Sequence, residues 1–350
     1  MKKSKKIVLS IAIILSSLTI CVTSVFSFII IGSGVGIYFT YLHHYKGKNI
    51  VDEWHETDEF NDERVVTLQK QKDKDFVILN LADVQMCDLE DTFHRPLIHK
   101  EITELVERTH PDLITLTGDQ TWSNENLVSL KALIRWLDGY KIPYAPVFGN
   151  HDYGNEYNSA VASLNYCSDL YENAKYSLFK RGPTNLGTLG NYAINIEEEG
   201  KIIKTLFMVD YGYQTSILPA QVHYFNWLAD GIKSMNNDEY TSSMVFMHKP
   251  TMEFFGYQYN ESLIQDLKGK GLTDAVAAHF HQINETNEYD NVRYTFACKT
   301  GELVFYYDDG ENYLNGGTTF TLSGDDVLIE NHYVDRETYH IKGSDNVYLD

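Results

Sequence analysis

Cysteine is scarce in this sequence, with four residues among 350. They stand at positions 21, 87, 167 and 298, so no pair has the CxxC spacing of a thiolate zinc site. Cys21 falls in a long apolar segment, which leaves three widely spaced cysteines in the rest of the chain. An odd number at wide spacing argues against a disulfide framework, although a single bridge remains open.

Basic side chains are also few compared with acidic ones. The whole sequence has 29 Lys and Arg against 49 Asp and Glu, and residues 1–48 contain six lysines and no acid. The remainder therefore has 23 basic and 49 acidic side chains, a net charge of −26. Such a surface repels nucleic acid and anionic lipid headgroups, so we expect no nucleic-acid partner. An anionic substrate would need local cations to attract it.

Charged residues and histidine are absent from residues 7–42. The stretch Ile7–Ile31 alone has 25 residues, mostly Ile, Leu, Val, Ser and Phe, whereas about 20 apolar residues suffice to cross a bilayer as a helix. The apolar part of a cleaved signal peptide is usually about 7 to 15 residues long and ends at a small-residue cleavage site. We therefore expect a transmembrane signal anchor at residues 7–31, with secretion after signal cleavage as the alternative.

The flanking lysines set the expected orientation of this anchor. Four of them lie in residues 1–6, and basic residues favour the cytoplasmic side of a membrane. Residues 1–6 then form a cytoplasmic basic stub, and everything after the anchor is extracytoplasmic. Residues 32–73 are interpreted as a polar linker or stalk, and residues 74–350 as one folded domain.

Strand-like and helix-like patterns alternate in the first half of that domain. Apolar runs at 76–81 and 113–117, and a third ending at Phe148, are separated by helical repeats at 97–106 and 127–137. This order predicts a βαβαβ unit with parallel strands, whose carboxyl ends meet at one edge of a sheet. Further strand-like runs lie at 191–196, 204–210, 243–247 and 274–278, with a helix near 219–234. The segment 292–329 is predicted to form antiparallel hairpins, with Asn315-Gly316-Gly317 as a turn signal.

Five of these strand-like runs end in residues that can bind metal or transfer protons. The residues are Asp83 and Gln85, then Asp119, then Asn150, His151 and Asp152, then His248, and finally His279 and His281. A single histidine at a strand end is usually structural, but recurrence at five ends of one sheet edge indicates a metal centre. Oxygen and imidazole ligands suit Zn, Fe or Mn. The number of candidates exceeds the needs of one tetrahedral ion, so we expect two metal ions, a pair that can hold a phosphoryl group during its displacement.

The five strand ends carry the motifs Asp83-Val84-Gln85, Gly118-Asp119, Gly149-Asn150-His151-Asp152, His248 and His279-Phe280-His281. In their order and roughly in their spacing, these motifs resemble those of the calcineurin-like metallophosphoesterases. The likeness covers about residues 75–305 and is greatest to the small single-domain branch related to purple acid phosphatases. It implies a four-layer αββα sandwich as the catalytic domain. It also implies hydrolysis of a phosphate ester carried by a small molecule or a phosphoprotein.

The resemblance also implies a role for each residue. Asp119 would bridge two divalent or trivalent ions, with Asp83, Gln85 and His281 on one of them. Asn150, His248 and His279 would hold the other. His151 would protonate the leaving oxygen, with Asp152 orienting its ring, and a metal-bridging hydroxide would be the nucleophile.

Two residues depart from the pattern of that family. Gln85 stands where the family usually has His, and Ala278 where it usually has Gly. We expect phosphomonoester hydrolysis, with phosphodiester hydrolysis as the first alternative. A degenerate metal-binding domain without catalysis is the second alternative, suggested by these two departures.

Overall fold

The computed structural model describes residues 47–334, except for 49, 87–93, 123–125, 154–163, 211, 213–215, 258–261, 302–314 and 325. These residues belong to one compact unit, which begins at Lys46. The predicted membrane anchor at residues 7–31 lies outside the described residues. Within them, no helix combines the length and the apolar character needed to span a bilayer.

The larger of two sheets has seven strands within the described residues, in the spatial order β1-β5-β6-β7-β8-β10-β9. In chain order these strands are β1 (Val65–Gln69), β5 (Tyr192–Glu198), β6 (Lys201–Val209), β7 (Ser243–Met247), β8 (Leu272–Ala277), β9 (Thr286–Tyr289) and β10 (Val292–Phe296). From β6 to β10 the neighbours are parallel. The carboxyl ends of β6, β7, β8 and β10 therefore lie at one edge of the larger sheet.

The smaller sheet has five strands over the same described ranges, in the order β12-β11-β2-β3-β4. They are β2 (Phe76–Leu81), β3 (Leu113–Thr117), β4 (Tyr144–Val147), β11 (Gly316–Ser323) and β12 (Asp326–Tyr333). The strands β2, β3 and β4 are parallel neighbours, connected through α2 (His94–Thr109) and α3 (Asn126–Tyr140). The predicted βαβαβ unit is confirmed.

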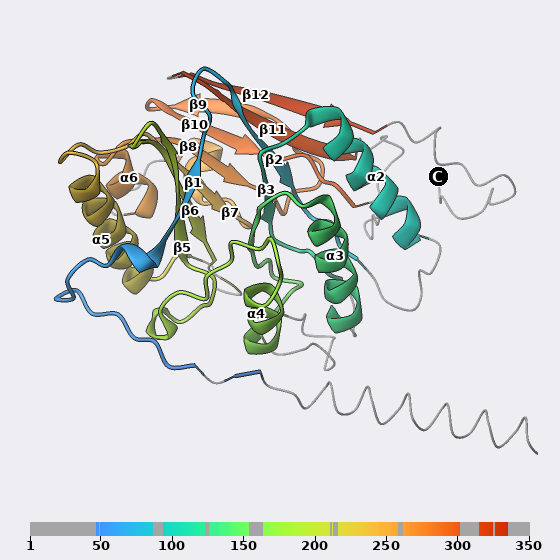
Figure 1. Cartoon of the computed structure of the whole chain (residues 1–350), viewed down its shortest axis with the longest axis horizontal. Coiled ribbons are helices and arrows are strands. Elements are labelled where there is room, and N and C mark those ends of the chain that lie inside the picture. The colour runs from blue at the N-terminus through green and yellow to red at the C-terminus, as the bar shows by residue number, and fades with distance from the viewer. Residues whose placement is uncertain are drawn as a thin grey trace, which may run out of the picture. The chain divides into compact units, whose positions relative to one another are not determined.

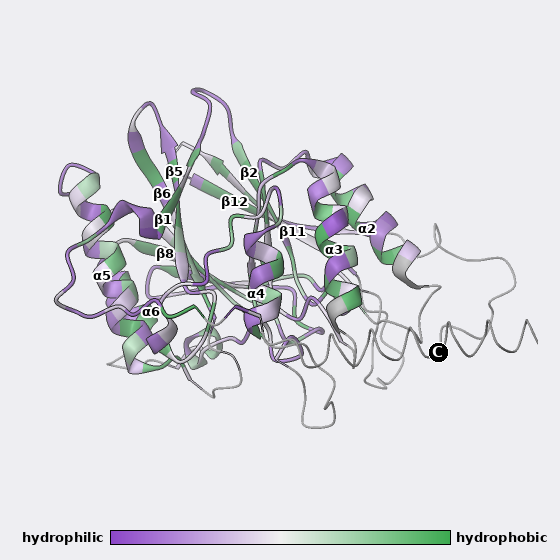
Figure 2. Cartoon of the chain, turned by 60° about the horizontal axis from the view of Figure 1, so that its bottom comes forward, coloured by the Kyte–Doolittle hydropathy of each residue, from purple (hydrophilic) through white to green (hydrophobic). Residues whose placement is uncertain are grey.

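The helices cover the outer faces of the two sheets (Figure 1). On one side, α5 (Pro219–Met235) and α6 (Leu263–Lys268) share an apolar core with the larger sheet. On the other side, α2 packs on the smaller sheet, while α3 contacts the short helix α4 (Leu164–Glu172). Figure 2 shows hydrophilic and hydrophobic residues together on these helices, as expected when one face of a helix rests on a sheet.

The inner faces of the sheets pack on each other. Phe246 in β7 meets Phe320 in β11 edge to face, with ring centroids 5.8 Å apart, and the Tyr192 hydroxyl in β5 donates to the Pro146 carbonyl in β4 at 2.8 Å. Strands β3 and β7 are buried along their whole length, as strands covered on both faces must be. Helix, sheet, sheet and helix thus follow one another, which fits the predicted four-layer αββα sandwich.

The folded unit begins earlier than the sequence indicates. Residues 32–73 were interpreted as a stalk because they are polar, but β1 pairs in parallel with β5 in the larger sheet. Trp54 is 5% exposed and lies in the core beside α5. Its ring meets those of Tyr224 and Trp227 at 5.3 and 5.8 Å between centroids. The boundary predicted at residue 74 is therefore wrong, because a few apolar side chains anchor an otherwise polar segment.

We expect Trp54→Ala to lower the free energy of unfolding by about 3 kcal/mol, because it leaves a cavity against α5. Chemical denaturation of the full chain measures this. Val51→Ala is a suitable control, since Val51 is 72% exposed and its truncation should change stability little. Equal stability of the two variants would contradict the placement of Trp54 in the core.

The predicted turn at Asn315-Gly316-Gly317 is also wrong. Both glycines belong to β11, where a Cβ on Gly316 would lie 2.0 Å from the His332 carbonyl oxygen of β12. These glycines allow neighbouring strands to lie close together. The β11–β12 hairpin turns at Gly324, whose φ is +60°. The antiparallel hairpin expected in this segment is present, whereas β10 joins β8 in parallel.

Candidate metal centre and active site

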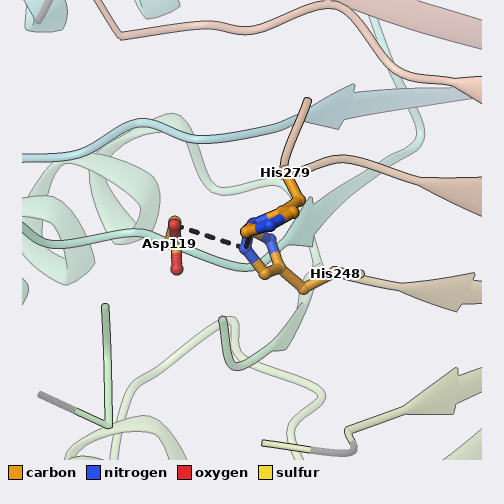
Figure 3. A group of neighbouring side chains, drawn as sticks. All are labelled: Asp119, His248 and His279. Atoms are coloured by element: carbon orange, nitrogen blue, oxygen red, sulfur yellow. Dashed lines mark hydrogen bonds and ion pairs between the residues drawn. The ribbon is translucent and has the colours of Figure 1, made fainter. Parts of the chain in front are cut away.

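Three of the predicted ligands form a compact group at the carboxyl ends of β3, β7 and β8. The ligand atoms of Asp119, His248 and His279 all lie within 4.8 Å of one another (Figure 3). His248 Nε2 is 3.3 Å from Asp119 Oδ2 and 3.3 Å from His279 Nδ1. His248 Nδ1 donates to the Thr117 carbonyl at 2.9 Å, which turns Nε2 toward the group.

The other predicted ligands join this group through direct contacts. Asn150 Oδ1 is 3.1 Å from His248 Nε2. Asp83 accepts the backbone N–H of His279 at 3.1 Å, and its other oxygen is 3.2 Å from His281 Nε2. That same nitrogen of His281 lies 3.2 Å from Gln85 Nε2. The structure thus connects all seven predicted ligands, although they come from both sheets.

The backbone of this site has an unusual conformation. Asp83, Gln85, Asp119 and His279 all have positive φ, at 48°, 47°, 50° and 71°. Side chains other than glycine rarely adopt this left-handed region, and such residues concentrate at functional sites. Each of these residues leaves the end of a strand, where a left-handed turn redirects its side chain from the sheet toward the shared centre.

A close approach of two loops needs glycine at position 118. Gly118 has φ +86°, and a Cβ there would lie 2.6 Å from the His248 ring. Glycine therefore allows Asp119 and His248 to come from different sheets and still meet. The Gly-Asp pair read from the sequence is explained by this contact.

The charges in the group depend on one another. Burial alone would raise the pKa of Asp119, but His248 and His151 outweigh it and hold that pKa well below its usual range. Burial alone would lower the pKa of His248, but the Asp119 carboxylate outweighs the effect of burial and raises this pKa to about 9. Burial, followed by repulsion from His248, lowers the pKa of His279 to about 4. A cation is thus strongly favoured beside Asp119.

A sequence model of the calcineurin-like phosphoesterases matches residues 76–283. The chain belongs to this family. It is therefore a hydrolase of phosphoric ester bonds, and the matched segment contains every predicted site residue from Asp83 to His281.

Solved structures of similar fold include three proteins at low sequence identity. GAP50, the anchor in the inner membrane complex of Plasmodium, gives a TM-score of 0.49 at 14% identity over 74% of this chain and 84% of its own. A dimetal phosphatase from Danio rerio gives 0.49 at 12% identity over 74% and 96%. The protein TT1561 of Thermus thermophilus gives 0.39 at 12% identity over 74% and 99%. No curated protein matches the sequence, and no conclusion about substrate follows from these likenesses.

The residues of this phosphoesterase suit the dinuclear metal centre that its family uses. Gln85 is fully buried, and its Oε1 has no hydrogen-bond partner among the described residues. A buried carbonyl oxygen without a partner is costly unless it coordinates a cation. Gln85 lies against His281 through its Nε2, and His281 lies against Asp83. These three residues would hold one ion, and Asn150, His248 and His279 would hold the other. The departure at Gln85 is thus compatible with metal binding.

His151 lies at the edge of this centre. Its ring packs against Trp122, and its Nε2 is 3.7 Å from Asp119 Oδ2. Its backbone N–H donates to Asp119 Oδ1 at 2.8 Å. Burial lowers the pKa of the His151 ring, partly opposed by Asp119. This position allows the imidazole to reach a group bound at the centre.

Asp152 has different partners from those expected. Its carboxylate accepts the backbone N–H groups of Gly149, Gln120 and Thr121 at 2.8, 3.3 and 3.0 Å. It also accepts the Thr121 hydroxyl at 3.1 Å. Among the described residues these donors account for both oxygens, and the His151 ring is not one of them. Asp152 therefore fixes the loop after β4 to the loop after β3, instead of orienting the ring of His151.

Two further strand ends carry charged residues that the sequence analysis missed. Asp210 follows β6 and is fully buried, and burial raises its pKa to about 7. Lys299 follows β10, is buried, and donates from Nζ to the Asp83 carbonyl at 3.4 Å. The signal for Asp210 was present, because the apolar run at 204–209 also ends in a carboxylate.

Proposed function

We propose that this phosphoesterase hydrolyses phosphomonoesters. The proposal rests mainly on the connected group of seven candidate ligands, with His151 at its edge. This group would hold two metal ions, which would supply positive charge for the phosphoryl oxygens and for activation of water. The protein residues orient the phosphate, and the His151 imidazole gives a proton to the leaving oxygen.

Lys249, the residue after the candidate ligand His248, supports the choice of a monoester over a diester. Lys249 directly follows His248, is half-buried, and interacts electrostatically with Asp119 and Asp210. Burial lowers the pKa of its ammonium group. A phosphomonoester carries up to two negative charges on its phosphoryl group and a diester only one. A cation at this position therefore stabilises the bound monoester more.

A comparison of two chromogenic substrates tests this proposal. The full chain is purified, its metal content is measured, and turnover of p-nitrophenyl phosphate and bis(p-nitrophenyl) phosphate is followed with added Mn, Zn or Fe. We expect two bound ions and a higher kcat/KM for the monoester. Faster turnover of the diester would favour phosphodiester hydrolysis. Bound metal without turnover of either compound would favour a metal-binding domain without catalysis.

We also propose that the catalytic domain is held at the outer face of a membrane. The uncharged segment 7–31 and the lysines before it support this orientation. External protease applied to intact cells should then degrade the catalytic domain. Protection of the domain until the cells are lysed would contradict the orientation, and release of the domain into the medium would indicate signal cleavage.

A further inference from the structure

Asp210 has a fixed position at the carboxyl end of β6. Its backbone N–H donates to Asn191 Oδ1 at 3.3 Å, and its carbonyl accepts the Thr188 hydroxyl at 2.6 Å and Gln221 Nε2 at 2.5 Å. Gln221 also donates to Asn191 at 2.8 Å and accepts the Leu218 N–H that precedes α5. These buried polar contacts hold the main chain of Asp210 in one place.

The carboxylate of Asp210 accepts a hydrogen bond from the Tyr153 hydroxyl. Its other oxygen accepts the Gly212 N–H at 2.9 Å. A Cβ on Gly212 would lie 2.7 Å from the Tyr153 ring, so this ring lies directly against the backbone after β6. The ring also meets Phe148 edge to face, at 6.4 Å between centroids. Tyr153 is therefore held at both its hydroxyl and its ring.

Tyr153 ends the segment Gly149–Tyr153 that carries Asn150 and His151. The Asp152 carboxylate fixes this segment to residues 120 and 121, and the His151 N–H fixes it to Asp119. All these anchors lie in the loop after β3 of the smaller sheet. Two contacts connect the segment to the larger sheet, which supplies His248 and His279: Asn150 Oδ1 lies 3.1 Å from His248 Nε2, and the Tyr153 hydroxyl donates to Asp210. The Tyr153 bond therefore holds the end of the segment, after His151, relative to the other half of the centre.

From this geometry we propose that Asp210, through the Tyr153 hydroxyl, is a positioning residue for the His151 imidazole. The proposal rests on the proposed role of His151 as proton donor to the leaving oxygen. Without the hydroxyl bond the segment keeps its anchors on the smaller sheet, so the metal ligands remain in place. The ring of His151 then samples positions from which proton transfer is slower.

The test compares leaving groups that need protonation to different extents. An alkyl alcohol is a poor leaving group and depends on proton donation, whereas p-nitrophenolate leaves as a stable anion. We expect Tyr153→Phe in the full chain to lower kcat for an alkyl phosphate by about ten- to a hundredfold, because a shift near 1 Å of a catalytic group costs up to about a hundredfold in rate. Turnover of p-nitrophenyl phosphate, the KM values and the number of bound ions should change little.

A double-mutant cycle then connects Tyr153 to His151. We expect His151→Ala to lower kcat for the alkyl phosphate by about a hundred- to ten-thousandfold, and adding Tyr153→Phe should lower it no further. Asp210→Asn retains an acceptor oxygen and should fall between the wild type and Asp210→Ala. Tyr140→Phe is the matched control, because that hydroxyl pairs with Thr103 at 2.8 Å between α2 and α3; its kinetics should equal those of the wild type.

Two results would overturn this positioning role while leaving the proposed function intact. One is an equal loss on both substrates in Tyr153→Phe, which indicates general damage to the site. The other is a full additional loss in the double variant, which indicates that Tyr153 acts independently of His151. If His151→Ala alone has no effect on the alkyl phosphate, the proton-donor role is wrong, and the positioning role of Asp210 is wrong with it.

Discussion

Asp119→Asn is expected to lower kcat/KM by about a thousandfold or more and to reduce the number of bound ions. The substitution preserves the shape of the side chain and the oxygen that accepts the His151 N–H at 2.8 Å. It removes the negative charge that faces His248 Nε2 at 3.3 Å and lies among ligand atoms within 4.8 Å. A metal pair contributes several kcal/mol to stabilising a phosphoryl transition state, and about 1.4 kcal/mol corresponds to tenfold in rate. Metal analysis and steady-state kinetics on the same sample measure both effects.

Asp169→Asn provides the matched control for Asp119→Asn. Asp169 is also buried, and it pairs with Arg181 at 2.7 Å; within the described part of the chain, its side chain has hydrogen bonds to the Lys48 N–H and to Arg181 and to none of the seven candidate ligands. Arg181 keeps Glu172 at 3.0 Å, so losing the Asp169 charge should destabilise the protein by about 1 to 3 kcal/mol without changing metal content or kcat. If Asp119→Asn behaves like Asp169→Asn, with lower stability and normal metal binding, then Asp119 does not bridge the ions.

The βαβαβ unit of the fold could be predicted because its signals are local. The runs that became β2 and β3 are continuous and apolar, and the helices between them repeat with a helical period, so their type and parallel order follow from short stretches of sequence. β1 escaped prediction because its residues are polar on one face and its partner, β5, lies more than a hundred residues later. Its strand character depends on that distant pairing, and the same holds for the burial of Trp54.

The candidate site was predictable for a different reason. Parallel strands place their carboxyl ends at one edge, so recurrence of His after Met247 and Ala277 was enough to place His248 and His279 at one edge of the larger sheet. The one sheet edge expected for all the ligands is in fact the meeting of two sheets, and Asp119 reaches the group from the smaller one through their packing. The partners of Asp152 could not be read in this way. Three of its four donors are backbone N–H groups, two from the neighbouring loop and one from Gly149, and backbone donors leave no trace in the sequence. The proposed role of Asp210 could not be predicted from the sequence either, because it depends on the position of the Tyr153 side chain, whose hydroxyl donates to Asp210.

Gly149→Ala is expected to lower kcat/KM by about a hundredfold or more, although it adds only one methyl group. The backbone of Gly149 is outside the left-handed region, so alanine could adopt its conformation without strain. The obstacle is a lack of space, because a Cβ would lie 2.2 Å from both the backbone nitrogen and Oδ1 of Asp119. Either Asp119 or the loop with Asn150 and His151 must move, and a shift near 1 Å at a catalytic site costs about a hundredfold in rate. Kinetics with saturating metal measure the loss.

Gly139→Ala separates this steric effect from the general effect of replacing glycine. Gly139 lies in α3 with nothing within 4 Å of its added Cβ, so alanine should stabilise the helix by about 0.5 to 1 kcal/mol and leave kcat/KM unchanged. The two substitutions are chemically identical and differ in what the methyl group meets. If Gly149→Ala retained normal turnover, the close contact between the loops after β3 and β4 would not be needed for catalysis. The convergence of the two loops on Asp119 could then not explain the glycine before Asn150.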